Sequence, residues 1–344
     1  MVGRRAWYLA AGVAVLVLLC VVCIGLGWAQ GRRGNSFARV RDVHQRHTGR
    51  LLAIRGVVGT AVGEAPDGAS EIKVFAKDPD VVDVPEELEG VPVTVEVTGE
   101  FIALAKPAAK APGPKLTPTS TWPRPVPIGV STGNEYEISA GTISCRVVDG
   151  AGNVYALSNN HVYALENRAP LGSRVLQPGR YDTRRYQVLE ANVIGHLFDW
   201  ERIVLSETAS NLIDAAIADS NVSLLSNSTP PDGYGTPLST TVPASVRQSV
   251  QKYGRTTRLT KGSVDAINAT LKVSYSSGTA RFVDQIIVKA PGFIKPGDSG
   301  SLLVTDPDRA PVGLLFAGNP DGSYAIANRI DLVLDAFGVE VDGE

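Results

Sequence analysis

The sequence predicts a mainly β protein, with a small α+β domain in front of it and an apolar helix at the N-terminus. The chain contains 35 glycines and 22 prolines, which favours turns over a helical bundle. Short runs of β-branched and apolar residues recur between about residues 124 and 341, and turn residues separate them. Many short strands joined in this way are typical of a β-barrel or a β-sandwich. The length of 344 residues allows two or so domains.

Residues 1–31 are interpreted as a signal peptide or a membrane anchor. The 26 residues 6–31 carry no charge and follow Arg4 and Arg5. At ~1.5 Å per residue, a transmembrane helix of this length crosses a ~30 Å hydrocarbon core. Small residues that end at Ala29 suit a signal peptidase, whereas the length of the apolar run favours an uncleaved anchor.

We therefore expect residues 6–29 to contact the membrane and the folded body to lie outside the cytoplasm, or to be secreted if cleavage follows Ala29. Arg4 and Arg5 support this orientation. Six arginines between residues 32 and 50 oppose it, because positively charged flanks tend to stay in the cytoplasm. A body that faces the cytoplasm is the alternative.

Residues 37–105 are predicted to form the small α+β domain. Strands are expected at residues 57–63 and 71–76, each rich in β-branched or apolar residues. The alternating valines of residues 91–97 have the two-residue period of a half-buried strand. Residues 85–88, which begin with proline, suit the first turn of a helix.

Residues 106–127 contain seven prolines and are predicted to be an extended, semi-rigid linker. Such a linker implies few contacts across the boundary, so residues 120–344 are expected to fold without the first domain. The second domain is placed at residues 124–341 and ends in a helix at residues 328–337, whose apolar residues share one face. Its strands are expected at residues 142–148, 188–194, 215–218, 262–268, 272–275, 285–289, 301–305 and 312–317.

Charge and cysteine usage exclude several classes of partner. The net charge is −2, so the sequence lacks the excess of basic residues that is typical of nucleic-acid-binding proteins. Of the three cysteines, Cys20 and Cys23 lie in the apolar segment and only Cys145 lies in the folded part. Neither an internal disulfide nor a zinc or iron–sulfur cluster is therefore expected, and Cys145 is interpreted as a small buried residue. No metal ion or cofactor is expected.

The segment Pro-Gly-Asp-Ser-Gly-Ser at residues 296–301 lies between two predicted strands and is the first chemical motif. A serine hydroxyl is a weak nucleophile unless a base takes its proton and donors stabilise the oxyanion. The glycines around Ser299 allow a tight turn in which the N–H groups of Gly297 and Ser299 point into one concavity. The alternative is a simple turn that joins two strands.

The base is expected to be one of four histidines. None follows Ser299, which excludes the chain order of the α/β-hydrolases. His161 ends a polar turn after an apolar strand, in Ser-Asn-Asn-His, and is the best candidate. His196 lacks that setting and is interpreted as a structural histidine. His44 and His47 lie among arginines and are interpreted as a solvated basic flank rather than a metal site.

The orienting acid is expected between His161 and Ser299 in the sequence. Asp214 heads the small apolar run Ala-Ala-Ile-Ala, and burial there suits an acid that holds a histidine tautomer and stabilises imidazolium. Asp199 and Asp219 are the alternatives.

Together these residues resemble the chymotrypsin-like (trypsin-like) serine peptidases, which share the chain order His, Asp, Ser. More closely, the segment Ser-Asn-Asn-His-Val at residues 158–162 is similar to that of the narrow-leaf-type trypsin-like proteins of plants and bacteria. The resemblance covers roughly residues 50–340. Further similar segments are residues 57–60, 90–93, 124–129 and 254–257.

The resemblance implies two six-stranded β-barrels with the site in the cleft between them. His161 and Asp214 would come from the first barrel and Ser299 from the second. It also implies a substrate pocket walled by Phe293 and by Phe316, Ala317 and Gly318. Apart from Asp298, no carboxylate lies just ahead of the nucleophile, which disfavours a pocket for basic side chains. Small or apolar side chains are therefore expected before the cleaved bond. Asp298 is expected to brace the turn, since no cleavage site would create a new N-terminus to pair with it.

The sequence thus predicts a serine endopeptidase that acts on protein or peptide substrates through His161, Asp214 and Ser299, with an oxyanion hole of the Gly297 and Ser299 N–H groups. The alternative from another class is an inactive peptidase fold retained as a binding module at the membrane. A serine esterase is a third hypothesis, which the chain order of the triad disfavours.

Overall fold

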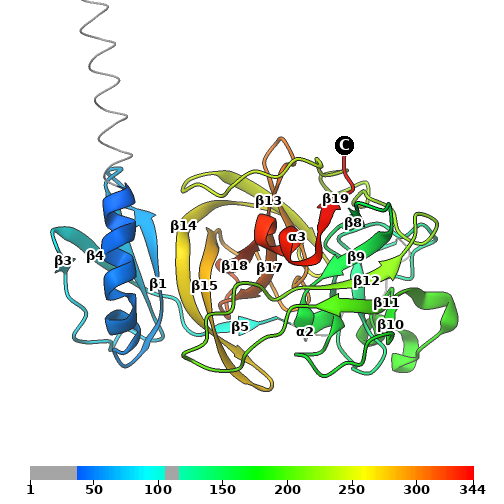
Figure 1. Ribbon diagram of the computed structural model, residues 1–344, viewed down its shortest axis with the longest axis horizontal. Coiled ribbons are helices and arrows are strands. Elements are labelled where there is room, and N and C mark those ends of the chain that lie inside the picture. Colours follow the sequence, from blue (N-terminus) through cyan, green and yellow to red (C-terminus); the bar gives the residue numbers. More distant parts are fainter. Residues whose placement is uncertain (1–36, 105–115) are drawn as a thin grey trace, which may run out of the picture.

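The computed structural model describes residues 37–104 and 116–344 (Figure 1). The predicted anchor or signal peptide of residues 1–31 lies outside these residues. Within the part of the chain that is described, no helix is both long enough and apolar enough to span a bilayer. The described chain is mainly β and is built on two sheets.

The first sheet has eight strands in the order β19-β8-β9-β12-β11-β10-β6-β7. A one-turn helix, α2 (Asn160–Tyr163), follows β9 directly. Short 3-10 helices lie at Arg180–Asp182, Arg184–Tyr186 and Glu190–Asn192. The strands are β6 (Ser131–Asn134), β7 (Gly141–Thr142), β8 (Arg146–Asp149), β9 (Val154–Ser158), β10 (Arg174–Leu176), β11 (Val193–Trp200), β12 (Ala216–Ser220) and β19 (Val339–Val341).

Cys145 lies in the core of this sheet, 1% exposed. Burial raises the pKa of its thiol to about 12, so the sulfur stays protonated and unreactive at neutral pH. This agrees with its interpretation as a small buried residue.

The second sheet contains a closed antiparallel barrel. Strands β13, β16, β17, β18, β15 and β14 pair in that order, and β14 pairs again with β13. The predicted six-stranded barrel is therefore present here. The first sheet closes as well, because the segment from β7 to β8 pairs with β6 at its start and, through Ser144 and Cys145, with Leu157 of β9 further on. The strands are β13 (Ser249–Gly254), β14 (Arg258–Tyr275), β15 (Gly278–Lys289), β16 (Leu302–Thr305), β17 (Pro311–Gly318) and β18 (Tyr324–Arg329).

Most of the predicted strands of the second domain are present, with three differences. The runs 262–268 and 272–275 belong to one long strand, β14, and the run 142–148 is divided between β7 and β8. Of the run 188–194 only the last two residues belong to β11, and a 3-10 turn at Glu190–Asn192 precedes them. The C-terminal helix is α3 (Ile330–Phe337), which ends at Gly338 in the left-handed conformation that glycine favours.

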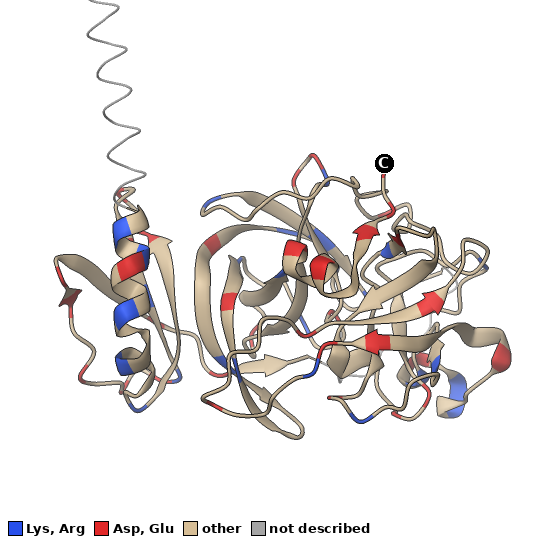
Figure 2. Cartoon of the chain, viewed as in Figure 1, with Lys and Arg blue, Asp and Glu red and all other residues tan. Residues whose placement is uncertain are grey.

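The N-terminal unit consists of a helix over residues 37–52 and four strands. These strands are β1 (Val57–Glu64), β2 (Ser70–Ala76), β3 (Glu87–Leu88) and β4 (Val91–Val97). The helix buries Val40, Val43 and Leu51 against β2, and Figure 2 shows the basic bands on its other faces. The predicted helical turn at residues 85–88 is wrong, because positive φ angles at Glu89 and Gly90 reverse the chain and pair β3 with β4.

The N-terminal unit and the barrel share one sheet, which contradicts the expectation of few contacts between them. Strand β1 pairs with β14, and Gly59 is required there because a Cβ would lie 2.1 Å from Leu271. Lys73 of β2 forms buried ion pairs with Glu96 at 2.8 Å and with Asp265 of β14 at 2.9 Å. Opposite charges buried together in this way resist separation of the two parts.

The predicted linker is also shorter than expected. Residues 105–115 lie outside the described part, but residues 116–127 pack on the first sheet, where Val126 is buried and hydrogen-bonded to Leu224 and Ser226. Before the gap, a short strand, β5 (Phe101–Ala103), pairs with both β14 and β17. The second half of the proline-rich stretch is therefore part of the fold rather than a spacer.

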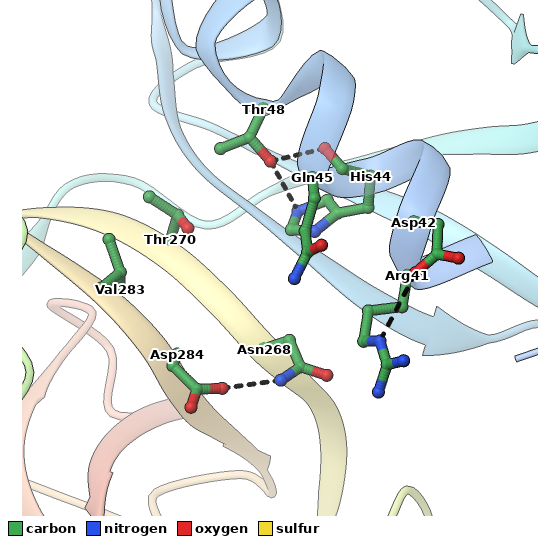
Figure 3. A pocket seen from close by; sticks show the side chains of 9 residues that line it. All are labelled: Arg41, Asp42, His44, Gln45, Thr48, Asn268, Thr270, Val283 and Asp284. Carbon is green, nitrogen blue, oxygen red and sulfur yellow. Dashed lines mark hydrogen bonds and ion pairs between the residues drawn. The ribbon is translucent and has the colours of Figure 1, made fainter. Parts of the chain in front are cut away.

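His44 is buried, contrary to the predicted solvated flank. Its ring is 2% exposed, and its Nε2 lies 2.9 Å from Thr60 Oγ1 of β1. Burial lowers its pKa to about 4. The ring borders a hollow of about 500 Å³ between the helix of residues 37–52 and strands β14 and β15, shown in Figure 3. His47 instead contacts Glu89 at 2.7 Å near the surface.

A chain that begins at Leu116 is expected to be less stable than one that begins at Phe37. It loses the burial of Phe101 and Leu104, each worth about 1.5–3 kcal/mol, and leaves the β14 edge unpaired. The melting temperature should fall by at least ~5 °C, measured by circular dichroism. Equal melting temperatures for the two chains would restore the expectation of an independent second domain.

The free energy of unfolding should depend on pH partly because of His44. The unfolded histidine binds a proton below pH ~6.5 and the folded one only near its lowered pKa, so the folded state loses up to about 3 kcal/mol as the pH falls between these values. Urea unfolding at neutral pH and near pH ~4.5 should show this loss in the wild type and not in His44→Gln. His196→Gln, at an exposed histidine, serves as the control. The same pH slope in His44→Gln and wild type would contradict the assignment.

Candidate active site

His161 is held by the turn that follows β9. It lies in α2 and is 2% exposed. Its Nδ1 is 2.6 Å from Asp214 Oδ2, and its backbone N–H donates to Asp214 Oδ1 at 3.1 Å. Asn159, two residues earlier, donates from Nδ2 to the Asp214 carbonyl at 2.8 Å. The polar turn predicted from the sequence therefore fixes both the ring and the backbone of His161 on one carboxylate.

Asp214 is fully buried just before β12. Besides the two His161 donors, its Oδ2 accepts a hydrogen bond from the Tyr275 hydroxyl at 2.8 Å, and its backbone N–H donates to Asn328 Oδ1 at 2.9 Å. Burial raises the pKa of the Tyr275 phenol well above its usual value, and the Asp214 charge adds to this, so the hydroxyl remains a donor. A buried carboxylate is thus supplied with the donors that it needs.

Tyr275 is a functional residue that the sequence analysis missed. It lies at the end of β14, 61 residues after Asp214, and no motif surrounds it. Its hydroxyl reaches the acid because the two sheets pack together, since β14 and β12 belong to different sheets.

Ser299 lies in the turn before β16 and is fully buried. This turn contacts the first sheet, since a Cβ on Gly141 would lie 3.0 Å from the Ser299 carbonyl and 2.5 Å from Val162, the neighbour of His161. The Ser299 Oγ donates to the Phe316 carbonyl at 3.1 Å, while His161 Nε2 is buried without a hydrogen-bond partner among the described residues. The Ser299 hydroxyl and His161 Nε2 are therefore not hydrogen-bonded to each other in this structure.

The turn around Ser299 is braced by Asp298. Its buried carboxylate accepts hydrogen bonds from the N–H groups of Thr256, at 2.8 Å, and Lys295, at 3.0 Å. Lys252, also fully buried, has its Nζ 3.5 Å from the same carboxylate. Burial lowers the pKa of Lys252, and Asp298 opposes that effect. An internal lysine thus provides the positive charge that faces Asp298, and the sequence analysis did not anticipate it.

Gly297 has a φ of +97°, and a Cβ there would lie 2.6 Å from Thr256 Oγ1, so only glycine fits. Its N–H, one of the two predicted oxyanion donors, donates to the Leu104 carbonyl at 2.6 Å. The carbonyl of Gly297 accepts from Thr142 Oγ1 of the first sheet at 2.8 Å. The donor is therefore oriented by contacts from both sheets.

The predicted pocket residues lie around β17. Phe316 and Ala317 are fully buried in that strand, Gly318 ends it, and Phe293 is 1% exposed. The space beside them contains Leu104, because a Cβ on Gly318 would lie 3.3 Å from Leu104 Cδ1. The walls are apolar, as the prediction of an apolar pocket requires.

The alternative residues lie elsewhere. His196 and Asp219 contact each other at 3.4 Å between β11 and β12, each about half exposed, and Asp199 bonds the backbone N–H of Trp200. The hollow of Figure 3 contains none of the triad residues. Within residues 37–104 and 116–344, no group of three His, Cys, Asp or Glu side chains is placed to hold a metal ion.

Comparisons with known proteins identify solved structures only. No family model and no curated protein matches this chain. A glutamic acid specific serine protease with a novel histidine triad in substrate binding is 20% identical, with a TM-score of 0.45 over 63% of this chain and 100% of that one. Cellulomonas bogoriensis chymotrypsin is 19% identical, with a TM-score of 0.43 over 63% and 98%. Thermobifida fusca protease A is 18% identical, with a TM-score of 0.45 over 64% and 100%. All three are proteases by name.

Tyr275→Phe is expected to destabilise the fold by about 1.5–3 kcal/mol, because it removes a hydrogen bond to a buried carboxylate. The matched control is Tyr155→Phe, whose hydroxyl bonds Asp149 at 3.1 Å near the surface and should cost less than about 1 kcal/mol. Equilibrium unfolding in urea measures both. Equal losses in the two variants would show that Tyr275 has no special relation to Asp214.

Proposed function

We propose that this chain is a serine endopeptidase in which Ser299 is the nucleophile, His161 the general base and Asp214 the orienting acid. The observation that carries the proposal is the buried His161–Asp214 pair. The Nε2 of His161 has no hydrogen-bond partner among the described residues, and the adjacent Val162 lies with the Ser299 carbonyl around Gly141. No metal ion or cofactor takes part in the proposed chemistry.

The proposed reaction begins with rotation of Ser299 Oγ from the Phe316 carbonyl to His161 Nε2. Oγ then attacks the carbonyl carbon of the scissile peptide while His161 accepts its proton. Asp214 stabilises the imidazolium that forms, and it can do so without becoming protonated because its other donors are fixed. His161 returns the proton to the leaving amine, and water then hydrolyses the acyl-enzyme on Ser299.

The oxyanion of the tetrahedral intermediate would accept hydrogen bonds from the N–H groups of Gly297 and Ser299. The Asp298 contacts and the Thr142 hydroxyl hold this turn before substrate arrives. Such preorganised donors are effective because they need no rearrangement during the reaction. Loss of one typically raises the activation free energy by about 2.7–4 kcal/mol.

The substrates are proposed to be proteins or peptides with a small or apolar side chain before the cleaved bond. Phe293 and β17 supply apolar walls, and the described residues of that pocket include no carboxylate. Residues 6–29 are proposed to hold the enzyme on a membrane with its body outside the cytoplasm, or to direct secretion if cleavage follows Ala29. The apolar length and the charges of Arg4 and Arg5 support this, and the six arginines between residues 32 and 50 oppose the orientation.

The second candidate is an inactive peptidase fold that serves as a binding module. The absent hydrogen bond between Ser299 and His161 favours it, since the nucleophile is bonded to the Phe316 carbonyl instead. Substitution of the triad distinguishes the two functions.

Ser299→Ala and His161→Ala are each expected to lower the kcat for labelled casein by about 10⁶-fold, and Asp214→Asn by about 10⁴-fold, as found for triads of this kind. The effects should be non-additive, because the three residues act as a unit. His196→Ala is the matched control and should retain full activity, since this histidine is half exposed and outside the site. Casein hydrolysis at the wild-type rate in any single triad variant, or additive losses, would reject the proposed mechanism.

A further inference from the structure

Strand β5 lies where a peptide substrate of the proposed enzyme would bind. It is drawn in cyan in Figure 1, between β15 and α2. It pairs antiparallel with β17, with Ala103 opposite Ala317 and Ile102 opposite Gly318. The same register places Leu104 opposite Phe316, the residue whose carbonyl accepts the Ser299 hydroxyl. The segment therefore runs along the predicted pocket strand and ends at the nucleophile.

The carbonyl of Leu104 binds one of the two predicted oxyanion donors. It accepts the Gly297 N–H at 2.6 Å, the donor that would stabilise the oxyanion of a substrate. Chain direction matters here, because only a strand antiparallel to β17, with its C-terminal end at Ser299, presents a carbonyl in this way. Residues 101–104 thus have the orientation of the acyl side of a substrate.

The side chains of β5 and its neighbour fill apolar sites. Leu104 is 2% exposed and packs in one cluster with Phe293 and Ile294. Phe101 is fully buried and packs with Phe316, its ring edge-on to Phe75 at 5.8 Å. Gly318 provides the room for Leu104, since a Cβ there would leave only 3.3 Å. The pocket is therefore matched in size and polarity to leucine.

We propose that residues 101–104 are the chain's own first substrate, and that Ser299 cleaves the peptide bond after Leu104 within the same molecule. This inference rests on the proposed function. Until the bond is cut, β5 excludes other substrates from the cleft. The segment also defines a preferred substrate class, a peptide with leucine before the cleaved bond and an aromatic residue three positions earlier.

The proposed self-cleavage is an ordinary peptide hydrolysis. Ser299 Oγ bonds to the Leu104 carbonyl carbon, and His161 Nε2 takes the hydroxyl proton. The C–N bond to the next residue breaks, and His161 returns the proton to that nitrogen, which becomes the amine of a new chain end. Water then hydrolyses the Leu104 ester, which leaves a carboxylate on Leu104 and the hydroxyl on Ser299.

The test is an incubation of the full chain, purified in detergent, followed by intact-mass and N-terminal analysis. The wild type is expected to yield two fragments, one ending at Leu104 and one beginning at Ala105, at a first-order rate that does not change on tenfold dilution. Ser299→Ala should remain intact, also when mixed with wild type. Leu104→Ala should be cut at least about 10-fold more slowly, because the pocket is left part empty. Leu171→Ala, at an exposed leucine, is the matched control and should be cut at the wild-type rate.

The contrary outcomes separate the inference from the proposed function. If wild type degrades labelled casein but remains uncut after Leu104, self-cleavage is wrong and the peptidase function stands. If the wild type neither degrades casein nor cuts itself after Leu104, both self-cleavage and the proposed peptidase function are wrong. If added wild type cuts the Ser299→Ala chain after Leu104, the reaction is intermolecular and the proposal of cleavage within one molecule is overturned.

Discussion

The buried carboxylate of Asp214 is the constraint on which the arrangement of this molecule depends. It is fully enclosed, so each of its oxygens needs donors. Two come from His161 in the first sheet and one from Tyr275 in the second, while Asn328 of β18 accepts the Asp214 N–H. The two sheets therefore cannot separate without leaving a charge unsatisfied in the interior. The same contacts orient the imidazole, which makes the junction of the sheets and the proposed site one structure.

The residues with chemical motifs were predictable, and the residues that support them were not. Spacing, chain order and local burial single out His161, Asp214 and Ser299 from the alternatives His196, Asp199 and Asp219. Tyr275 and Lys252 carry no local signal. Tyr275 reaches Asp214 through the packing of the two sheets, and Lys252 reaches Asp298 through the pairing of β13 with β16. The helix of residues 37–52 was missed because its few apolar positions, Val40, Val43 and Leu51, are spread among arginines.

The relation between the N-terminal unit and the site could be seen only in the structure. Four residues before a proline-rich stretch, Phe101 to Leu104, look in the sequence like the end of a domain. Their proposed role depends on the register of β5 with β17. A shift by one residue would move Leu104 out of the pocket and its carbonyl away from Gly297. In this register β5 covers the strand β17 on which the proposed substrate would lie, and the pairing of β1 with β14 ties the N-terminal unit to the same sheet.

The central claim is that Ser299 is a nucleophile activated by His161. Its most direct test is labelling of the full chain by a fluorophosphonate at neutral pH, followed by mass spectrometry of the digested protein. The account predicts a single modified peptide containing Ser299, no modification in Ser299→Ala, and labelling at least ~10³-fold slower in His161→Ala. Labelling of His161→Ala at the wild-type rate, or modification of a different residue, would contradict it.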